Sequence, residues 1–519
     1  MTIHLSIILF LPLATGLSGA LMPRGTGRWA VLAGTVAVLA YVVAILIDFE
    51  PGGGLQYVTN DDWIPELGIH YALGVNGLSL FMIALTAIAW VACTLVVAFS
   101  ELERPRLFFF HLALAETAVL GAFLAQDLAL FIVFFDLMLV PFYFLIGGWG
   151  SGDRVRATTK FVIYTLSGSL LMMAAAIALG VLATPDGGSI SFLLSDLRER
   201  SVPLGSQEWI VLLFALAFFV KAPLFPLHGW VPDTYRATSI PVLALLSGVL
   251  SKVGVYAFLQ IVLPIMPDGS QHWQELFIVL AVFSILYGSV LAFSQDNIRL
   301  VLAYSSIAQL GFIVLGIFAL EEKGAQGALF QMLNHGIVTV ALFLIVGVIA
   351  ARAAGNESLS ELGGMAFRAP ALAALFLITA LATLAMPGSG NFIGEILILF
   401  GTFENKLVYG LVAAAGVVLA AVYMIRVYQG TMHGPVAPAV ESRDIDRLHL
   451  SALAPLVAIV IALGLYPNFV VHRTERATTG AIAEARVAGA AQKAGAAQEG
   501  SRPQPAGAAA RIDVVEESP

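Results

Sequence analysis

The feature that most constrains this chain is a series of apolar stretches, each about 20 residues long, that recurs along most of the sequence. That length is what a helix needs to cross the hydrocarbon layer of a bilayer. Because the bilayer offers the backbone no hydrogen-bond partners, helices are the only plausible spanning element here. With 59% hydrophobic and 12% charged residues, the chain is predicted to be an all-α polytopic membrane protein.

Fourteen spans are predicted: 3–22, 29–47, 73–99, 107–124, 129–148, 160–183, 208–227, 241–264, 274–294, 299–319, 326–351, 370–402, 406–429 and 451–470. The N-terminus turns apolar at Ile3 without a basic leader, which indicates a retained first helix rather than a cleaved signal. The tail from about residue 474 is rich in Ala, Gly and Gln and is predicted to be disordered, without a long helix after the last span.

Basic residues are concentrated in alternate loops. These are Arg24 and Arg28; Arg104 and Arg106; Arg154, Arg156 and Lys160; Arg236; Arg299; Arg352 and Arg368; Arg443 and Arg447. The intervening loops hold fewer, and the loop at 48–72 is acidic. The positive-inside rule therefore predicts that the first set faces the cytoplasm and that both termini lie outside.

Several function classes lack their signatures. The sequence has no basic patch for nucleic acid, no nucleotide-binding glycine loop, no haem ligand pair and no hydrolytic triad. The single cysteine, Cys93, lies in an apolar stretch, which excludes an internal disulfide and a cysteine metal site. No metal is expected, and transport is favoured over redox chemistry or hydrolysis within this chain.

Two parts of the chain resemble each other. AQDLALFIVF (125–134) and SQDNIRLVLA (294–303) place Gln-Asp before the fifth and tenth spans, and broken helices follow in the seventh and twelfth. The matching spans are five apart, and successive spans cross the membrane in alternate directions, so the two copies would run in opposite directions. Inverted repeats with broken helices indicate a transport site near mid-membrane. The breaks are assigned to Pro223, Pro226, Pro387, Gly388 and Gly390.

The resulting division has five parts: helices 1–3 (1–106), a first five-helix repeat (107–264), a second, inverted repeat (265–430), helix 14 with its preceding loop (431–473), and the tail (474–519).

Four charged residues stand out within the apolar spans: Asp136, Lys221, Lys252 and Glu395. Charges inside a membrane are costly and mark functional pathways. The alternative is that they form structural ion pairs or, except for the central Lys252, extend to the surface. Pro223 and Pro226 remove two amide donors, and ordered water or the Lys221 ammonium is expected to satisfy the freed carbonyls.

Polar residues also recur at helical spacing. Gln331, His335 and Thr339 form one such stripe, and Tyr304, Ser305 and Gln309 form another. They would line a hydrated proton path, or equally make hydrogen bonds between helices. His228, near the cytoplasmic end, is assigned to the path or to capping the broken helix.

Six segments together resemble the antiporter-like subunits of respiratory complex I, NADH-quinone oxidoreductase. They are FFDLMLVPFYFLIGGWG, VKAPLFPLHGWVPDTY, LLSGVLSKVGVYAF, LAYSSIAQLGF, QMLNHGIVTVALF and MPGSGNFIGEILIL, in family order between about residues 70 and 470. By this resemblance Lys221 and Lys252 match the lysines of the seventh and eighth helices. Glu395 matches the twelfth-helix position, where M-type subunits (chain 4 in mitochondria) have glutamate and L and N types have lysine. The chain departs from the family at Asp136, where glutamate is usual, and at Gln309, where histidine is usual.

The resemblance implies proton translocation across the bacterial inner membrane, coupled to electron transfer from NADH to quinone. Asp136 and Lys221 would form a switch pair, from which the proton passes by Lys252 and His335 to Glu395. No cofactor is expected in this chain; flavin mononucleotide, iron–sulfur clusters and quinone would belong to partner subunits, with the sister subunits L and N as neighbours. Two alternatives remain: a subunit of a multi-subunit Na⁺/H⁺ antiporter, and a stand-alone secondary transporter.

Overall fold

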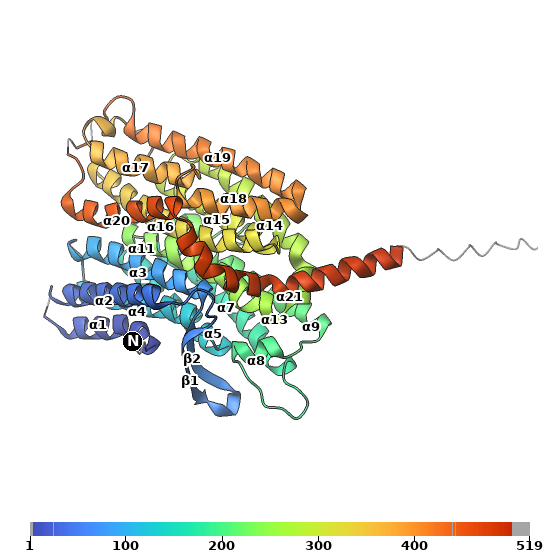
Figure 1. The fold of residues 1–519 in the computed structure, drawn as a ribbon. Coiled ribbons are helices and arrows are strands. Elements are labelled where there is room, and N and C mark those ends of the chain that lie inside the picture. The colour runs from blue at the N-terminus through green and yellow to red at the C-terminus, as the bar shows by residue number, and fades with distance from the viewer. Residues whose placement is uncertain (1–3, 24, 438–439, 442, 501–519) are drawn as a thin grey trace, which may run out of the picture.

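The computed structural model describes residues 4–23, 25–437, 440–441 and 443–500, and helices dominate it (Figure 1). The N-terminal part contains α1 (Leu5–Leu21), α2 (Gly27–Asp48), β1 (Gln56–Ile64), the 3₁₀ turn η1 (Pro65–Leu67), β2 (Ile69–Val75) and α3 (Gly77–Ala98). The first predicted repeat contains α4 (Pro105–Leu124), α5 (Leu128–Leu137), α6 (Leu139–Trp149), α7 (Arg154–Leu182), α8 (Leu194–Glu199), α9 (Leu204–Lys221) and α10 (Val231–Ala237).

The eighth span is one long helix with two π-helical segments: α11 (Ile240–Leu245), η2 (Leu246–Leu250), α12 (Ser251–Ala257), η3 (Phe258–Val262) and α13 (Leu263–Ile265). The rest comprises α14 (Pro267–Ser294), α15 (Ile298–Phe318), α16 (Glu322–Arg352), η4 (Met365–Phe367), α17 (Pro370–Thr383), α18 (Gly390–Asn405), α19 (Leu407–Met432), α20 (Arg447–Leu465) and α21 (Asn468–Gly500).

The predicted polytopic membrane fold is confirmed. Among the described residues, twelve helical segments are long and apolar enough to cross a membrane, and α1 and α17 are shorter apolar helices. Each of the fourteen predicted spans overlaps a helical segment, with α17 and α18 sharing the twelfth. Fourteen complete crossings, and the orientation of the termini, stay predictions.

The loop at 48–72 is not a plain loop. Its residues from Gln56 form an antiparallel hairpin in which β1 pairs with β2, so the chain is not all-α. The tight connection contains Gly68, which has φ +63 and lies against the backbone of Ile190, so a side chain there would collide. β1 is mostly exposed, whereas β2 ends in four consecutive buried residues, Ala72–Val75, which pack the hairpin against the bundle.

The two Gln-Asp segments occupy equivalent places. Asp127 is the N-cap of α5 and Asn297 is the N-cap of α15, one residue away from the alignment of the Gln-Asp pairs themselves. Each N-cap makes an isolated antiparallel bridge, Asp127 with Leu193 and Asn297 with Ser358. In both cases the bridging residue lies in the loop that precedes the broken helix. These matched bridges support the predicted repeat, while its inverted relation stays a prediction.

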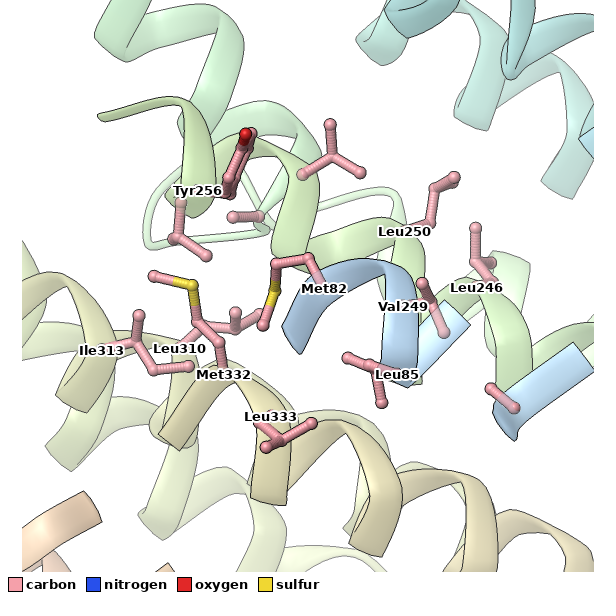
Figure 2. Packing of buried hydrophobic residues seen from close by; sticks show 14 of the residues in the cluster. Met82, Leu85, Leu246, Val249, Leu250, Tyr256, Leu310, Ile313, Met332 and Leu333 are labelled. Atoms are coloured by element: carbon pink, nitrogen blue, oxygen red, sulfur yellow. The ribbon is translucent and has the colours of Figure 1, made fainter. Parts of the chain in front are cut away.

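The centre of the molecule lies where the eighth span meets α3, α15 and α16. Figure 2 shows Met82 and Leu85 of α3 among Val249 and Leu250 of η2, with side chains of α15 and α16 on the other side. These residues are almost fully buried. The contact holds the first predicted repeat against the second, and it places Lys252 of α12 in the interior.

Two expectations for the tail are wrong, the disorder of residues 474–500 and the absence of a long helix after the last span, because α21 continues from Asn468 to Gly500. The sequence reading missed an apolar face built of small residues. Thr474, Thr478, Ala481, Ile482 and Ala485 are buried at helical spacing, and α21 packs against α3, α13, α14 and α16 (Figure 1). Alanine is also the strongest helix former. Residues 501–519 lie outside the described part of the chain.

The buried face of α21 makes a prediction. Ile482→Asp would place an unpaired carboxylate at a fully buried position, and we expect it to destabilise the protein by about 2–4 kcal/mol. The measurement is the apparent melting temperature of the detergent-solubilised protein. Val487→Asp is the matched control, because Val487 is 66% exposed on the same helix. Equal melting temperatures for the two variants would show that α21 does not dock.

Candidate functional site

The first charged residue of the site, Lys221, lies at the C-terminal end of α9. Lys221 is its last residue and is buried, and Pro223 and Pro226 follow. The carbonyl of Phe219 accepts from the Leu224 amide at 3.1 Å, and that of Val220 accepts from Trp230 Nε1 at 3.0 Å. For the freed Phe219 carbonyl, the partner is therefore a backbone amide of the turn and not the expected Lys221 ammonium.

The Lys221 ammonium instead faces the fifth span. Its Nζ donates to the Phe135 carbonyl at 3.2 Å and lies 4.3 Å from the centre of the Phe135 ring. The fifth span is interrupted at Met138, between α5 and α6, so this carbonyl is free to accept. Both the carbonyl and the ring face stabilise a cation.

Asp136 follows Phe135 directly and is the nearest source of negative charge for Lys221. The two groups make no ion pair within 4.0 Å among the described residues. The Asp136 carboxyl is half-buried beside Ser169 of α7, and its Oδ1 has no hydrogen-bond partner in the described part of the chain. Aspartate is one methylene shorter than glutamate, which is consistent with the absence of a direct contact here.

Lys252 is fully buried in the middle of the eighth span. Its Nζ donates to the Ser247 carbonyl at 2.9 Å and to Ser251 Oγ at 3.2 Å. That carbonyl belongs to the π-helical segment η2, and it also accepts from Ser251 Oγ at 2.7 Å. Lys252 is thus held by neutral oxygens alone among the described residues.

From Lys252 a polar path continues into the second half. Ser247 Oγ and Ser306 Oγ of α15 lie 3.2 Å apart. Ser306, His335 and Thr339 line a small cavity of about 10 Å³ between α15, α16 and α17, which is roughly the room that one water molecule needs. The structure therefore brings together the predicted His335 and Thr339 at one point.

Glu395 of α18 lies in a pair of amides. Gln309 Nε2 donates to Glu395 Oε1 at 2.9 Å, and Gln331 Nε2 reaches the same oxygen at 3.4 Å and Gln309 Oε1 at 2.7 Å. Glu395 does not lie among the free amides at the start of α18. The break extends over residues 384–389, Ser389 caps α18, and Glu395 is one full turn further along, beyond the free amides.

Two glycines make this arrangement possible. A Cβ at Gly390 would lie 1.9 Å from Asn334 Oδ1, and one at Gly394 would lie 2.4 Å from Gln331 Oε1. A Cβ at either position would displace the Asn334 or Gln331 side chain, and its absence lets α18 lie directly on α16. That close packing is what brings Glu395 to Gln331. Pro387 and Gly388 (φ +98) form the turn before it.

Two predicted path residues lie elsewhere. The His228 ring stacks on Phe225 at 5.8 Å and meets Tyr287 edge-on at 5.2 Å, so it packs against the broken segment and does not cap it. The Tyr304 phenol is half-buried and lies near Tyr287 and near Asp233 and Arg236 of α10, so it does not join Gln309 at Glu395. The predicted stripe of Tyr304, Ser305 and Gln309 therefore divides between two faces of α15.

The structure also shows groups that the sequence reading passed over. Ser247, Ser251 and Ser306 link Lys252 to the second half, and Tyr423 contacts Ser305 through their hydroxyls at 2.8 Å. Glu116, in the middle of α4, is fully buried. Glu116 could have been found from the sequence, because it is a charged residue inside the predicted span 107–124. The serines could not, because their contacts depend on how the helices pack.

Three comparisons relate the chain to known proteins. Residues 125–421 match the family NADH:quinone oxidoreductase/Mrp antiporter, TM. The chain is 34% identical over 480 residues to NADH-quinone oxidoreductase subunit M of Rickettsia typhi, covering 90% of this chain and 96% of that protein. It also matches a chain of respiratory complex I from Thermus thermophilus with a TM-score of 0.85 and 30% identity, covering 94% of this chain and 100% of that one.

The fold recurs in a further complex. A chain of the Mrp complex from a Dietzia species matches with a TM-score of 0.81 at 22% identity, covering 93% of this chain and 98% of that one. The fold and the buried charged residues place the protein among polytopic antiporter-like membrane subunits. Within that class, the chain belongs to the NADH:quinone oxidoreductase/Mrp antiporter family, and its similarity to subunit M extends over most of its length.

The amides around Glu395 make a prediction. Gln309→Leu would remove the 2.9 Å hydrogen bond and leave the buried carboxyl with the longer one from Gln331. We expect a cost of about 1.5–3 kcal/mol if the carboxyl is charged, measured as a lower melting temperature of the purified protein. Gln309→His, which restores a ring N–H donor, is the control. Identical melting of all three proteins would show that the amide does not hold Glu395.

Proposed function

We propose that this chain is the proton-translocating M subunit of an NADH-quinone oxidoreductase in a bacterial inner membrane. The observation that carries the proposal is a series of three buried ionisable groups, Lys221, Lys252 and Glu395. Each is hydrogen-bonded to neutral carbonyl, hydroxyl or amide groups, which can bind both its charged and its neutral form. Charges are kept inside membrane proteins at such cost mainly for transport. The similarity to subunit M over 90% of the chain supports the same assignment.

In the first step, Lys221 acts as the proton carrier. Burial disfavours its charged form, whereas the Phe135 carbonyl and ring and the nearby Asp136 carboxylate favour it. A movement of α9 relative to α5 would weaken all three contacts together. The ammonium would then lose its proton, since no other stabilising group is close among the described residues.

In the second step, the proton passes to Lys252 and onwards. The Ser247 carbonyl and Ser251 hydroxyl accept from the Lys252 ammonium, and Ser251 could donate to its neutral amine. The pair Ser247 and Ser306 and the cavity at His335 continue towards α15 and α16. Glu395 would receive the proton at the far end, where the Gln309 amide can turn to present its oxygen instead of its N–H.

The redox chemistry belongs to other subunits in this proposal. Flavin mononucleotide, iron–sulfur clusters and the quinone would be held by partners, with subunits L and N as membrane neighbours and no cofactor in this chain. The complex would thus be the enzyme, and this chain its proton-moving part.

The main alternative is a subunit of a multi-subunit Na⁺/H⁺ antiporter, whose known structure shares the fold at 22% identity. Likeness at that level concerns the fold alone. Purification from native membranes in mild detergent distinguishes the candidates: co-purification with subunits that oxidise NADH supports the proposal. Co-purification with antiporter subunits alone would favour the alternative, and isolation as a single chain would favour a stand-alone transporter.

Lys221→Met tests the proton carrier. Methionine keeps the length and the helix propensity of the side chain but cannot bind a proton. We expect the assembled complex to lose most of its NADH-driven proton pumping, measured by the acidification of inside-out membrane vesicles. Lys323→Met, at a side chain 56% exposed to solvent, is the control. Normal pumping by an assembled Lys221→Met complex would refute the assignment.

Asp136 distinguishes a charge role from a packing role. Two charges 4 Å apart at an effective dielectric of ~20 interact by about 4 kcal/mol, and a wider gap weakens this without removing it. We therefore expect Asp136→Asn to lose most of the pumping, and Asp136→Glu, which extends the carboxylate towards Lys221, to keep it. Retained pumping in Asp136→Asn would show that its charge is dispensable.

A further inference from the structure

Glu116 differs from the other buried carboxyl groups in the described part of the chain. Three carboxyl residues there are buried: Asp127, Glu395 and Glu116. Asp127 accepts hydrogen bonds from the amides of His70, Ala129 and Leu130, and Glu395 accepts from Gln309. Both oxygens of Glu116 lack a partner among the described residues, although its exposed fraction is zero.

This difference determines the charge that Glu116 carries. A carboxylate without hydrogen bonds or a counter-ion in an apolar interior is strongly disfavoured, so the group holds a proton instead. A carboxyl that served only to join helices would be expected to make a hydrogen bond, because an unpaired buried polar group costs stability. The structure shows no such bond, so a joining role leaves Glu116 unexplained.

The position of Glu116 connects it to the charged residues of the first repeat. Phe123 lies two helical turns further along the same face of α4. The Phe123 ring packs against Tyr256 of α12 at 5.0 Å, and its carbonyl accepts from the Tyr256 hydroxyl at 3.1 Å. Tyr256 is one turn from Lys252. The face that carries Glu116 is therefore the one that meets the Lys252 helix.

A second contact of α4 is with α5, the helix that carries Asp136. A Cβ at Gly121 would lie 2.3 Å from the Phe134 ring of α5, two residues before Asp136. The helices α1, α2, α3, α5, α6 and α12 pack on α4. Their titratable groups are Arg28, Tyr41, Asp48, Cys93, Asp136, Tyr143, Lys252 and Tyr256, and α4 itself adds Arg106 and His111. None of them makes an ion pair or hydrogen bond with Glu116 in the described residues.

Lys252 presents the complementary situation, because it is fully buried and held by neutral oxygens only. We propose that Glu116 is a further proton-carrying residue of the first repeat, which holds a proton at rest and releases it when Lys252 becomes charged. This inference rests on the proposed function. In this cycle a Glu116 carboxyl oxygen passes its proton to a water molecule, the carboxylate that remains is the counter-charge to the Lys252 ammonium, and a proton from the cytoplasmic side later restores the acid.

The test uses the assembled complex in membrane vesicles. Glu116→Gln keeps the volume and the neutral charge of the resting side chain but cannot release a proton. We expect most of the NADH-driven pumping to be lost in Glu116→Gln and partly kept in Glu116→Asp, with Glu103→Gln, outside the spans, unchanged. A purely structural neutral group would tolerate glutamine, so full pumping by Glu116→Gln overturns the inference.

A second measurement does not depend on pumping. The infrared difference spectrum between resting and turning-over complex should contain a protonated-carboxyl carbonyl band that Glu116→Gln removes. Its presence in the wild type and absence in the variant support the inference, and an unchanged band overturns it. If Glu116→Gln does not assemble, Glu116→Asp decides, since a shifted band is then expected. If Lys221→Met loses pumping while Glu116→Gln pumps normally, only the role of Glu116 is refuted. If both variants pump normally, the proposed function is refuted as well.

Discussion

The arrangement of the first half depends on the contact between the Lys221 ammonium and the Phe135 carbonyl, 3.2 Å apart. A cation cannot stay inside an apolar bundle without such a partner. Two interruptions create the contact, because α9 ends at Lys221 and the fifth span breaks at Met138. Each break leaves backbone groups without their helical partners. In the turn after α9 the Phe219 carbonyl accepts from the Leu224 amide, whereas at the other break the Phe135 carbonyl of α5 accepts from Lys221.

The two halves hold their charges by different means. Lys221 and Lys252 are held by carbonyl and hydroxyl oxygens, two of them provided where a helix is broken or widened. Glu395 is held by glutamine amides, which approach it because Gly390 and Gly394 let α18 lie on α16. An amide can offer either an N–H or an oxygen, so the same pocket accommodates both the acid and its carboxylate. This suits a group that gains and loses a proton.

The fold alone does not specify the function. The Mrp chain has nearly the same architecture, with a TM-score of 0.81 at 22% identity, so the fold is a shared framework. A particular function has to be argued from the residues buried inside the bundle. In this chain they include Asp136, with no ion pair to Lys221 among the described residues, and Gln309, an amide beside Glu395. The proposed role therefore depends on these residues rather than on the overall shape.

The sequence by itself determined the membrane spans, the two helix breaks and the four charged positions, because hydrophobic length, proline and ionisable side chains act locally along the chain. The tertiary structure decided the rest: the docking of α21, the hairpin β1–β2, the separation of Tyr304 from Gln309, and the partners of Lys221, Glu395 and Glu116. The physical reason is that periodicity gives the face of a helix on which a residue lies. Which faces meet depends on close packing across the whole bundle, where small residues such as Gly394 and Ala481 permit contacts that no local pattern shows.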